Sequence, residues 1–339
     1  MQELHIGEND AGQRFDKYLK KLLAEAPGSF VYKMLRKKNI TLNSKKADGT
    51  EKLSCGDEVK LFLSDETYEK FRAKSKTVMP EAFSGSEKTL RQLKVLYEDA
   101  DILIINKPSG MLSQKARPED VSANEYILSY LLREGALTEE EMRTFRPSVC
   151  NRLDRNTSGI LIAGKTLKGL QEMSKALKER TIQKYYRCVV KGEVLREDYL
   201  KGWLVKDERE NKVTVSTVKP KSADAAPIET AYRPIWTGGG YTGLEVHLIT
   251  GRSHQIRAHL ASIGHPIIGD VKYGDAGTNE QFRRQCKVKS QMLHAYRIVF
   301  ADGREVIAPC GAEFARVEEW CKNPVSYTHL RAHETRHDL

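Results

Sequence analysis

The sequence lacks the features that mark membrane, secreted and zinc-bound proteins. No apolar run approaches the roughly 20 residues of a membrane-spanning helix, and residues 1–5 do not resemble the start of a signal peptide. The cysteines are scattered and form no C-x-x-C pair, so neither a zinc site nor a disulfide framework is indicated. We expect a cytoplasmic protein with reduced thiols and no membrane partner.

Negative charge is also in deficit. The 339 residues include 56 Lys and Arg against 46 Asp and Glu, a net charge of +10. Such a balance favours polyanionic partners, because Lys and Arg displace counterions from phosphates. Basic proteins also bind membranes and acidic proteins, so charge alone does not identify RNA. The length is sufficient for two domains that each bury a core.

Residues 12–63 read as a small α/β domain. Helical spacing of apolar residues indicates one helix around Phe15 to Leu22 and a second from Phe30 to Lys38, followed by short strands near 40–43 and 58–63. Every charged residue from Phe30 to Lys46 is basic. A one-faced basic helix is an electrostatic footprint for a phosphate backbone, and the candidate RNA-binding residues are Lys33, Arg36, Lys37 and Lys38. The alternative is a merely solvated helix face.

The remainder divides into a linker and a larger domain. Residues 64–90 are rich in Glu, Lys, Ser and Thr, which predicts a flexible linker. From 91 to 322 we expect strands at 102–106, 181–190 and 241–249, helices within 119–146 and from 167 to 180, and hairpins between 193 and 236. Thr166 is positioned to cap the second of these helices. Hairpins favour a mostly antiparallel sheet.

Asp154 is the residue with the clearest chemical context. It lies between Arg152 and Arg155, whose charge favours the ionised carboxylate. Residues 157–159 (Thr-Ser-Gly) have turn chemistry, and 160–164 are an apolar run of strand length. Asp154 is therefore predicted on a tight loop that enters a buried strand, where scaffolds present catalytic groups. The alternative is a solvated ion cluster of little energetic value.

Histidines raise the question of a metal. His254, His259 and His265 lie five and six residues apart, a spacing that does not place three ligands on one helical face. We therefore predict no metal site.

Several stretches resemble the RluA-type pseudouridine synthases, which isomerise uridines in ribosomal and transfer RNA. Residues 151–159 (NRLDRNTSG) resemble the family signature HRLDRxTSG, with Asn151 in place of the commoner His. The resemblance implies that Asp154 is the catalytic residue. It also implies contacts with the substrate from residues around it: Asn151, Arg152, Leu153, Arg155 and Thr157.

The family's other motifs are also present. Residues 96–112 (LYEDADILIINKPSGML) resemble the first motif, in which we expect Lys107 and Pro108 to be structural. Residues 184–186 resemble a K-x-Y segment, which implies that the Tyr186 ring stacks on the target base. Residues 248–274 resemble the last core motif, which implies that Arg257 pairs with Asp154. Nearby, Ser253 is predicted to cap a helix, and the expected substrate or supporting contacts are Arg252, His254 and Gln255.

The resemblance implies a fold and an activity. The fold is α+β, with a mixed, mostly antiparallel catalytic sheet, flanking helices and a small RNA-binding domain at residues 12–63 that resembles the S-four-type. The expected activity is isomerisation of uridine, most naturally in large-subunit (23S) ribosomal RNA, by a monomer. No cofactor is expected, because product and substrate contain the same atoms. The alternatives are a transfer RNA enzyme and a non-catalytic ribosome-assembly factor; a glycosidase would need a second paired acid.

The C-terminal residues have a separate interpretation. Residues 325–339 begin VSYTHLRAHET, which matches the translation of a common transposase sequencing adapter. We expect this tail to be non-native and without packed structure, and the native C-terminus to be missing.

Overall fold

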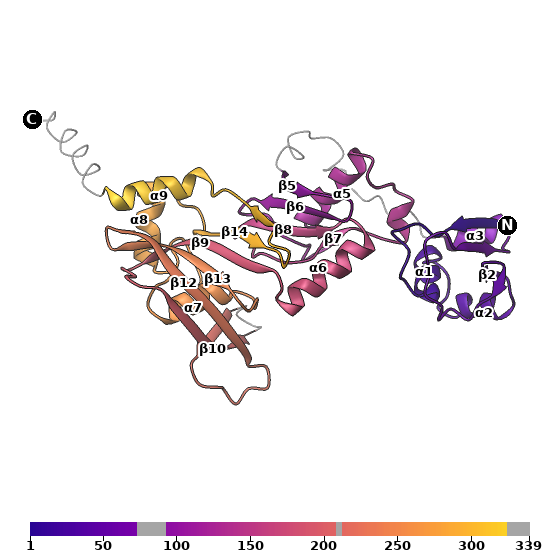
Figure 1. Cartoon of the computed structure of the whole chain (residues 1–339), viewed down its shortest axis with the longest axis horizontal. Helices are drawn as coiled ribbons and strands as arrows, with labels where there is room; N and C mark the ends of the chain where they lie inside the picture. The colour runs from indigo at the N-terminus through magenta and orange to yellow at the C-terminus, as the bar shows by residue number, and fades with distance from the viewer. Residues whose placement is uncertain (73–92, 208–211, 324–339) are drawn as a thin grey trace, which may run out of the picture. The chain divides into compact units, whose positions relative to one another are not determined.

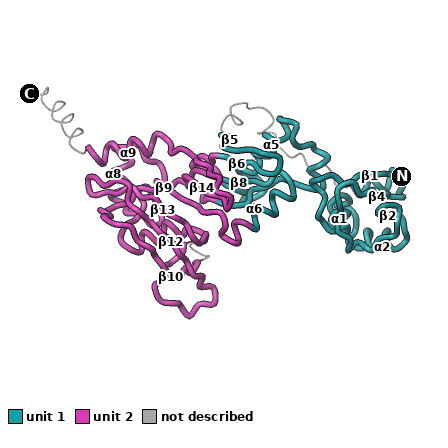
Figure 2. Tube along the Cα trace, viewed as in Figure 1, with its two compact units in different colours: residues 1–105, 113–152, 161–175 teal, residues 106–112, 153–160, 176–339 magenta. Residues whose placement is uncertain are grey.

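The computed structural model describes residues 1–72, 93–207 and 212–323 (Figure 1). Contacts divide the chain into two compact units (Figure 2): unit 1 comprises residues 1–105, 113–152 and 161–175, and unit 2 comprises 106–112, 153–160 and the chain from 176 onward. The predicted tail at 325–339 and residues 73–90 of the predicted linker lie outside the described residues.

The N-terminal part of unit 1 is a four-stranded antiparallel sheet with three helices. The strands β1 (Gln2–His5), β4 (Glu58–Leu61), β2 (Ile40–Leu42) and β3 (Lys45–Lys46) are adjacent in that order. Helices α1 (Phe15–Leu22) and α2 (Phe30–Arg36) pack against this sheet. Their buried apolar residues, among them Phe15 and Leu19, form one hydrophobic core with the strands. The basic side chains of α2 remain exposed.

The predicted linker was wrong at its start, because Asp65–Phe71 forms helix α3. The Ser64 hydroxyl accepts a hydrogen bond from the Thr67 N–H (3.2 Å) and so caps the helix. Tyr68 is buried, and the Phe71 ring lies 4.7 Å from the Phe30 ring, centroid to centroid. Two aromatic anchors in a polar sequence are enough to hold this short helix.

The rest of unit 1 contains β5 (Lys94–Glu98), most of β6 (Ile102–Lys107), β7 (Ser148–Val149), the end of β8 (Ser158–Gly164), α5 (Ala123–Arg133) and much of α6 (Leu167–Glu179). The helix expected within 119–146 is shorter: α5 ends before Gly135, which has a positive φ of 69°, and only a 3-10 turn follows at Glu141–Arg143. The predicted cap of α6 is confirmed, since the Thr166 hydroxyl accepts from the Gly169 N–H.

Unit 2 is built on a mostly antiparallel sheet, which confirms the predicted α+β fold. The strands follow the order β11 (Lys212–Ser216), β10 (Asp198–Asp207), β12 (Ala226–Gly238), β13 (Tyr241–Leu248), β9 (Gln183–Lys191) and β14 (Leu293–Val299), with β15 (Glu305–Ile307) beside β14. The helices are α7 (Gln255–Ser262), α8 (Ala276–Cys286) and α9 (Ala312–Lys322). No helix among the described residues is long and apolar enough to cross a bilayer.

Two features of this sheet position the site. Side chains alternate between the two faces of a strand, so Tyr186 of β9, paired with Val246 and Ala295, points to one face and Tyr185 to the other. The first residues of β8, which belong to unit 2, pair in parallel with β14, with Gly159 opposite Ala295. The Asp154 loop therefore enters the sheet beside β14, which separates it from β9, the strand that carries Tyr186.

Candidate active site

Asp154 and Arg257 meet although 103 residues separate them in the chain. The Arg257 Nη1 donates a 2.7 Å hydrogen bond to Asp154 Oδ2. The Asp154 side chain is 27% exposed and that of Arg257 only 6%. A buried, charged donor thus fixes one carboxylate oxygen while the group stays accessible to solvent.

Arg257 is itself fixed by a second carboxylate. Its Nε and Nη2 donate to the two oxygens of Asp270 at 2.7 and 2.9 Å. Asp270 is fully buried and also accepts from the N–H groups of Lys272 and Tyr273. Burial alone would raise the pKa of Asp270, but these donors outweigh it and lower that pKa. Burial likewise opposes the charge of Arg257, and its two acidic partners raise its pKa.

The loop that carries Asp154 is held by its own backbone and by Lys107. The Thr157 N–H donates to the Asp154 carbonyl (3.0 Å), which closes the turn. The ammonium of Lys107, which is fully buried, donates to three carbonyls, those of Pro108, Met111 and Arg155. Burial lowers the pKa of Lys107 to about 7, against the attraction of Asp154. Lys107 therefore joins two loops, the structural role expected for it.

His254 approaches Asp154 from the start of α7. Its Nε2 lies 4.0 Å from Asp154 Oδ2, and its Nδ1 lies 2.9 Å from the Tyr273 hydroxyl. That hydroxyl accepts from the Val213 N–H (2.9 Å) and is free to donate to Nδ1, which leaves the Nε2 proton toward Asp154. Burial lowers the pKa of His254. His254 is the N-cap residue of α7, with a left-handed φ of 55° and no capping hydrogen bond from its side chain, so the prediction that Ser253 caps this helix was wrong.

Gln255 holds the turn that precedes α7. Its carbonyl oxygen accepts from the Thr250 hydroxyl (2.8 Å) and the Arg252 N–H (3.1 Å), and its amide donates to Glu229 O and Thr230 Oγ1. Gln255 is buried, whereas the Arg252 side chain is exposed. Gln255 thus fixes the backbone from which Arg252 projects.

The remaining predicted residues differ in exposure. Leu153 and Thr157 are buried, and the Thr157 hydroxyl accepts from Gln291 Nε2 (3.1 Å). Asn151 Oδ1 accepts from the Ile162 N–H (2.8 Å). Arg152 and Arg155 are exposed. The alternative of an ion cluster with Asp154 is contradicted: within the described ranges Asp154 pairs with Arg257 and His254 instead.

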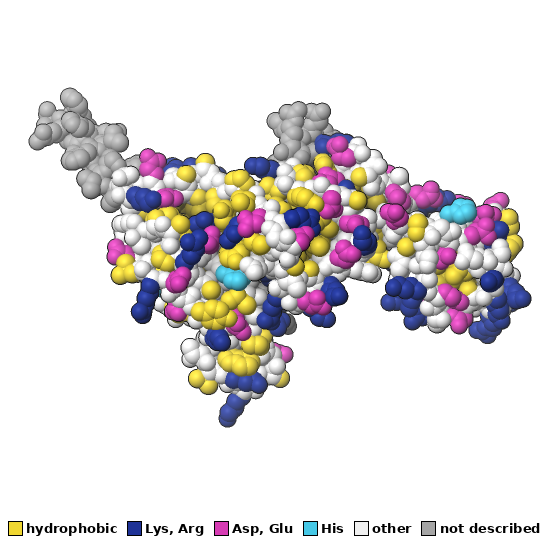
Figure 3. All heavy atoms as spheres, viewed as in Figure 1, with side chains coloured by type: hydrophobic (Ala, Val, Ile, Leu, Met, Phe, Trp, Pro, Cys, Tyr) yellow, Lys and Arg dark blue, Asp and Glu magenta, His cyan; other side chains and the backbone are white. Residues whose placement is uncertain are grey.

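Tyr186 lies close enough to Asp154 to feel its charge. Its side chain is 7% exposed, and burial together with the negative charge of Asp154 raises the pKa of its hydroxyl. The basic residues of the N-terminal sheet domain, Lys33, Arg36, Lys37 and Lys38, are all exposed. Figure 3 shows Lys and Arg side chains gathered around α2.

Sequence reasoning missed Asp270 and Tyr273, although both fall in the stretch 248–274. The available signal was a lone acid two residues after the apolar run 266–268, followed three residues later by an aromatic ring. The Arg257 guanidinium lies 5.1 Å from the Tyr273 ring centroid, within range of a cation–π contact. Over the part of the chain that is described, no group of three His, Cys, Asp or Glu side chains could hold a metal ion.

Comparisons with known proteins identify the family of the chain. The family model described as RNA pseudouridylate synthase matches residues 101–262. The chain belongs to the RNA pseudouridylate synthase family. Ribosomal large subunit pseudouridine synthase C of Vibrio vulnificus is 31% identical over 94% of this chain and 95% of its own length; that of Pasteurella multocida is 32% identical over 88% and 85%.

Solved structures agree on the fold. Human RNA pseudouridylate synthase domain containing 4 matches with a TM-score of 0.56 and 19% identity, over 68% of this chain and 92% of that one. Human RNA pseudouridylate synthase domain containing 1 matches with a TM-score of 0.51 and 21% identity, over 67% and 85%. The protein is thus an RNA pseudouridine synthase in fold and family.

Proposed function

We propose that this protein converts specific uridines to pseudouridine in large-subunit (23S) ribosomal RNA, with Asp154 as the catalytic carboxylate. The observation that carries the proposal is the 2.7 Å bond from the buried Arg257 to a solvent-accessible Asp154. The relatives from Vibrio and Pasteurella, which are ribosomal large subunit pseudouridine synthases by name, support the choice of RNA.

The reaction breaks the bond between ribose and ring nitrogen 1, turns the base and rejoins it through carbon 5. A carboxylate beside the ribose can form a temporary covalent bond to the sugar carbon that loses the base. Alternatively, it can stabilise the charge that develops on the ribose while the base is detached. Asp154 suits this role because its outer oxygen atoms are reachable and one of them is fixed by Arg257. Asp270 keeps the guanidinium in place throughout.

The uridine must leave its stack to reach the acid. Extrusion costs a few kcal/mol and is least costly in loops and unpaired regions. Tyr186 lies on the face of β9 turned toward Asp154 and would offset part of the cost by contact with the base.

Two regions divide the work in this proposal. Residues 12–63 form the RNA-binding domain, with the exposed Lys33, Arg36, Lys37 and Lys38 on the phosphate backbone, and residues 91–322 form the catalytic domain. The protein acts in the cytoplasm as a monomer.

The test replaces Asp154 with Asn, which keeps the shape and removes the charge. We expect Asp154→Asn to abolish tritium release from 23S transcripts labelled at uridine carbon 5, while its affinity for the same RNA stays within about twofold of wild type. The control is Asp302→Asn, an exposed acid bound to Arg304, which should remain active. Activity in Asp154→Asn would refute the assignment, and release from transfer RNA alone would refute the substrate.

A further inference from the structure

Lys184 is a partly buried cation in unit 2 that has no acidic partner. It is the second residue of β9, and its side chain is half-buried. Among the residues that the structure describes, its ammonium forms no ion pair and no hydrogen bond. Burial lowers the pKa of Lys184, and the charge of Arg180 lowers it further. A charge withdrawn from water without a partner costs free energy, so Lys184 is a candidate site for an anion.

Lys184 projects from the same face of the sheet as Tyr186. Side chains alternate along a strand, so these two lie on one face of β9, roughly 7 Å apart along its axis. Tyr185, between them, projects from the opposite face with its cross-strand partner His247. Because Tyr186 feels the charge of Asp154, Lys184 lies one strand repeat away from a ring of the proposed active site.

The ammonium of Lys184 lies against the turn that joins β13 to α7. Lys184 Nζ is 3.2 Å from the position that a Cβ on Gly251 would occupy. Gly251 does not have a positive φ, so its backbone does not require glycine, and the missing side chain instead leaves room beside the ammonium. The same turn leads to His254, whose Nε2 lies 4.0 Å from Asp154 Oδ2. The space beside Lys184 therefore adjoins the segment that approaches the acid.

Two further cations without acidic partners are associated with Lys184. Arg252 follows Gly251 directly, and Arg180 is the charge that acts on Lys184. Both are exposed, and neither forms an ion pair with a side chain in the described ranges. Exposed arginines elsewhere in unit 2 have such partners, as Arg304 has Asp302 (2.7 Å). Positive charge that is left unpaired here raises the local potential for an anion.

We propose that the Lys184 ammonium binds a phosphate of the substrate RNA strand beside the target uridine, with Arg252 and Arg180 adding positive potential around it. Phosphate is the anion that an RNA substrate brings to this place, and Lys binds it as a compact charge with three donors. The contact fixes the strand on one side of the uridine while the base lies against Tyr186. The inference rests on the proposed function, because the RNA and the extruded base come from there.

Ethylation interference tests the contact in the full-length protein. Phosphates of 23S transcript are ethylated sparingly, which removes their charge one at a time, and the molecules that Asp154→Asn protein still binds are separated and mapped. Wild type identifies the modified uridine on the same transcript. We expect ethylation of a phosphate next to that uridine to block binding, and the block to disappear when Lys184→Met is added. An interference pattern that Lys184→Met leaves unchanged would overturn the proposal.

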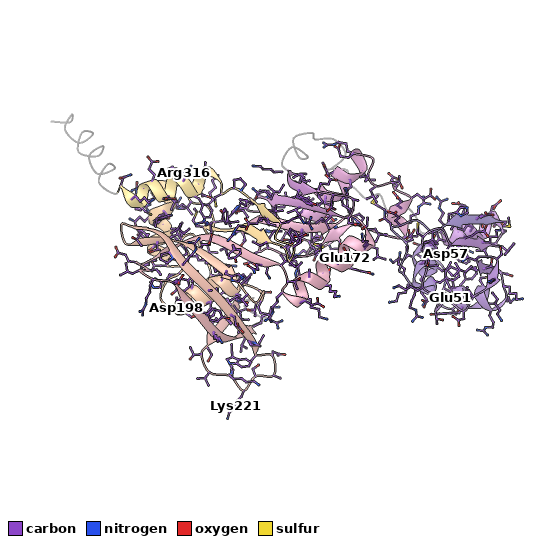
Figure 4. All side chains as sticks on the ribbon, in the orientation of Figure 1. Glu51, Asp57, Glu172, Asp198, Lys221 and Arg316 are labelled. Atoms are coloured by element: carbon purple, nitrogen blue, oxygen red, sulfur yellow. The ribbon has the colours of Figure 1, made fainter. Side chains whose placement is uncertain are left out.

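Affinity and stability together separate a binding role from a structural one. In the Asp154→Asn background, Lys184→Met should weaken binding to the transcript by on the order of tenfold. Its urea midpoint should stay or rise, because an unpaired, half-buried charge is removed and the side-chain length is kept. The control Lys221→Met removes an exposed charge between β11 and β12 (Figure 4) and should change affinity much less. Equal losses of affinity, or a lower urea midpoint at unchanged affinity, would contradict the phosphate site.

Activity on the same transcript separates the two proposals. Tritium release by wild type, together with an interference pattern that does not depend on Lys184, would leave the enzyme assignment standing and refute the phosphate site. Absence of release from wild type would refute the proposed function, and this inference would fall with it.

Discussion

Arg257 divides its guanidinium between two acids, the solvent-accessible Asp154 and the fully buried Asp270. One nitrogen bonds to Asp154, and the other two hold Asp270 in a fork. Such planar, bidentate recognition is the property that distinguishes Arg from Lys. In the proposed mechanism Asp270 is therefore a positioning residue, because it orients the guanidinium that holds Asp154.

The variant Asp270→Asn tests the positioning role, because it replaces one carboxylate oxygen that accepts from Arg257 by an amide nitrogen. We expect kcat to fall by at least about tenfold with KM little changed, because the acid is misplaced while RNA contacts persist. The free energy of unfolding should fall by about 3 kcal/mol, since the buried Arg257 loses half of its neutralising charge.

The matched control for that variant is Asp224→Asn, an exposed acid in unit 2. Urea denaturation gives the stability, and tritium release under single-turnover conditions gives the chemical step. Loss of stability at full kcat would contradict the positioning role and leave Asp270 a purely structural partner.

At the residue scale the sequence predicted one half of this arrangement. Arg257 and Asp154 were paired through the resemblance, and the structure brings them together. From the local sequence we chose Arg152 and Arg155 as the cations that keep Asp154 ionised, because the spacing of charges in a sequence identifies only neighbouring residues. Asp270 was missed because a fork between side chains 13 residues apart depends on how the α7 to β14 connection folds back.

At the scale of elements, the Asp154 loop is positioned by the close approach of β8 to β14 at Gly159 and Ala295. Gly159 has a φ of 110°, and a Cβ at that position would lie 2.2 Å from the Ala295 carbonyl oxygen. The parallel pairing of β8 with β14 thus requires a residue without a side chain. The neighbouring bond from the Ser158 hydroxyl to His294 Nδ1 (2.8 Å) depends on the same approach.

We expect Gly159→Ala to lower the free energy of unfolding by more than about 3 kcal/mol, or to prevent folding, because backbone atoms of β14 must move. The control is Gly264→Ala, where φ is also positive (84°) but nothing lies within 4 Å of the added Cβ. It should cost only about 1 kcal/mol. Similar losses in both variants, by urea denaturation, would show that backbone strain alone is responsible.

Element boundaries were predictable where apolar periodicity was strong. The buried strands and α6 were found from their spacing, and Thr166 from cap chemistry. Helix α3 was missed because its two aromatic anchors are too few to produce a period. The cap at His254 could not be predicted, because the sequence offers Ser253 beside it and Ser is the far commoner cap residue.

Across the whole molecule, buried histidines set a pH dependence. Burial lowers the pKa of His247, His254, His259 and His294. As pH falls below about 6.5 the unfolded chain takes up protons that the folded chain resists, so the free energy of unfolding should fall from about pH 7 to pH 5. His294→Asn should flatten the urea-derived curve and exposed His5→Asn should not. A stability that rises on acidification would contradict this.

The N-terminal charges predict how affinity depends on salt. Replacing Lys33, Arg36, Lys37 and Lys38 with Ala should weaken RNA binding and reduce the slope of log affinity against log salt by up to about 3. Chemistry of bound RNA should persist in single-turnover assays at saturating protein.

The comparison variant removes the same charge elsewhere, at the exposed Arg283, Arg284, Lys287 and Lys289. An equal change of slope in both variants would mean that overall charge, rather than a footprint on α2, attracts the RNA. The exposure of these Lys and Arg side chains could be predicted from the sequence, because long charged side chains are exposed in most structural contexts.

Tyr185 and Tyr186 are consecutive on β9 yet face opposite ways. A gain or loss of one residue earlier in that strand would exchange the faces of the two rings. Tyr185, which contacts Arg297, would then face Asp154, and Tyr186 would face the opposite side of the sheet. Homologues should therefore diverge here by substitution and never by change of length.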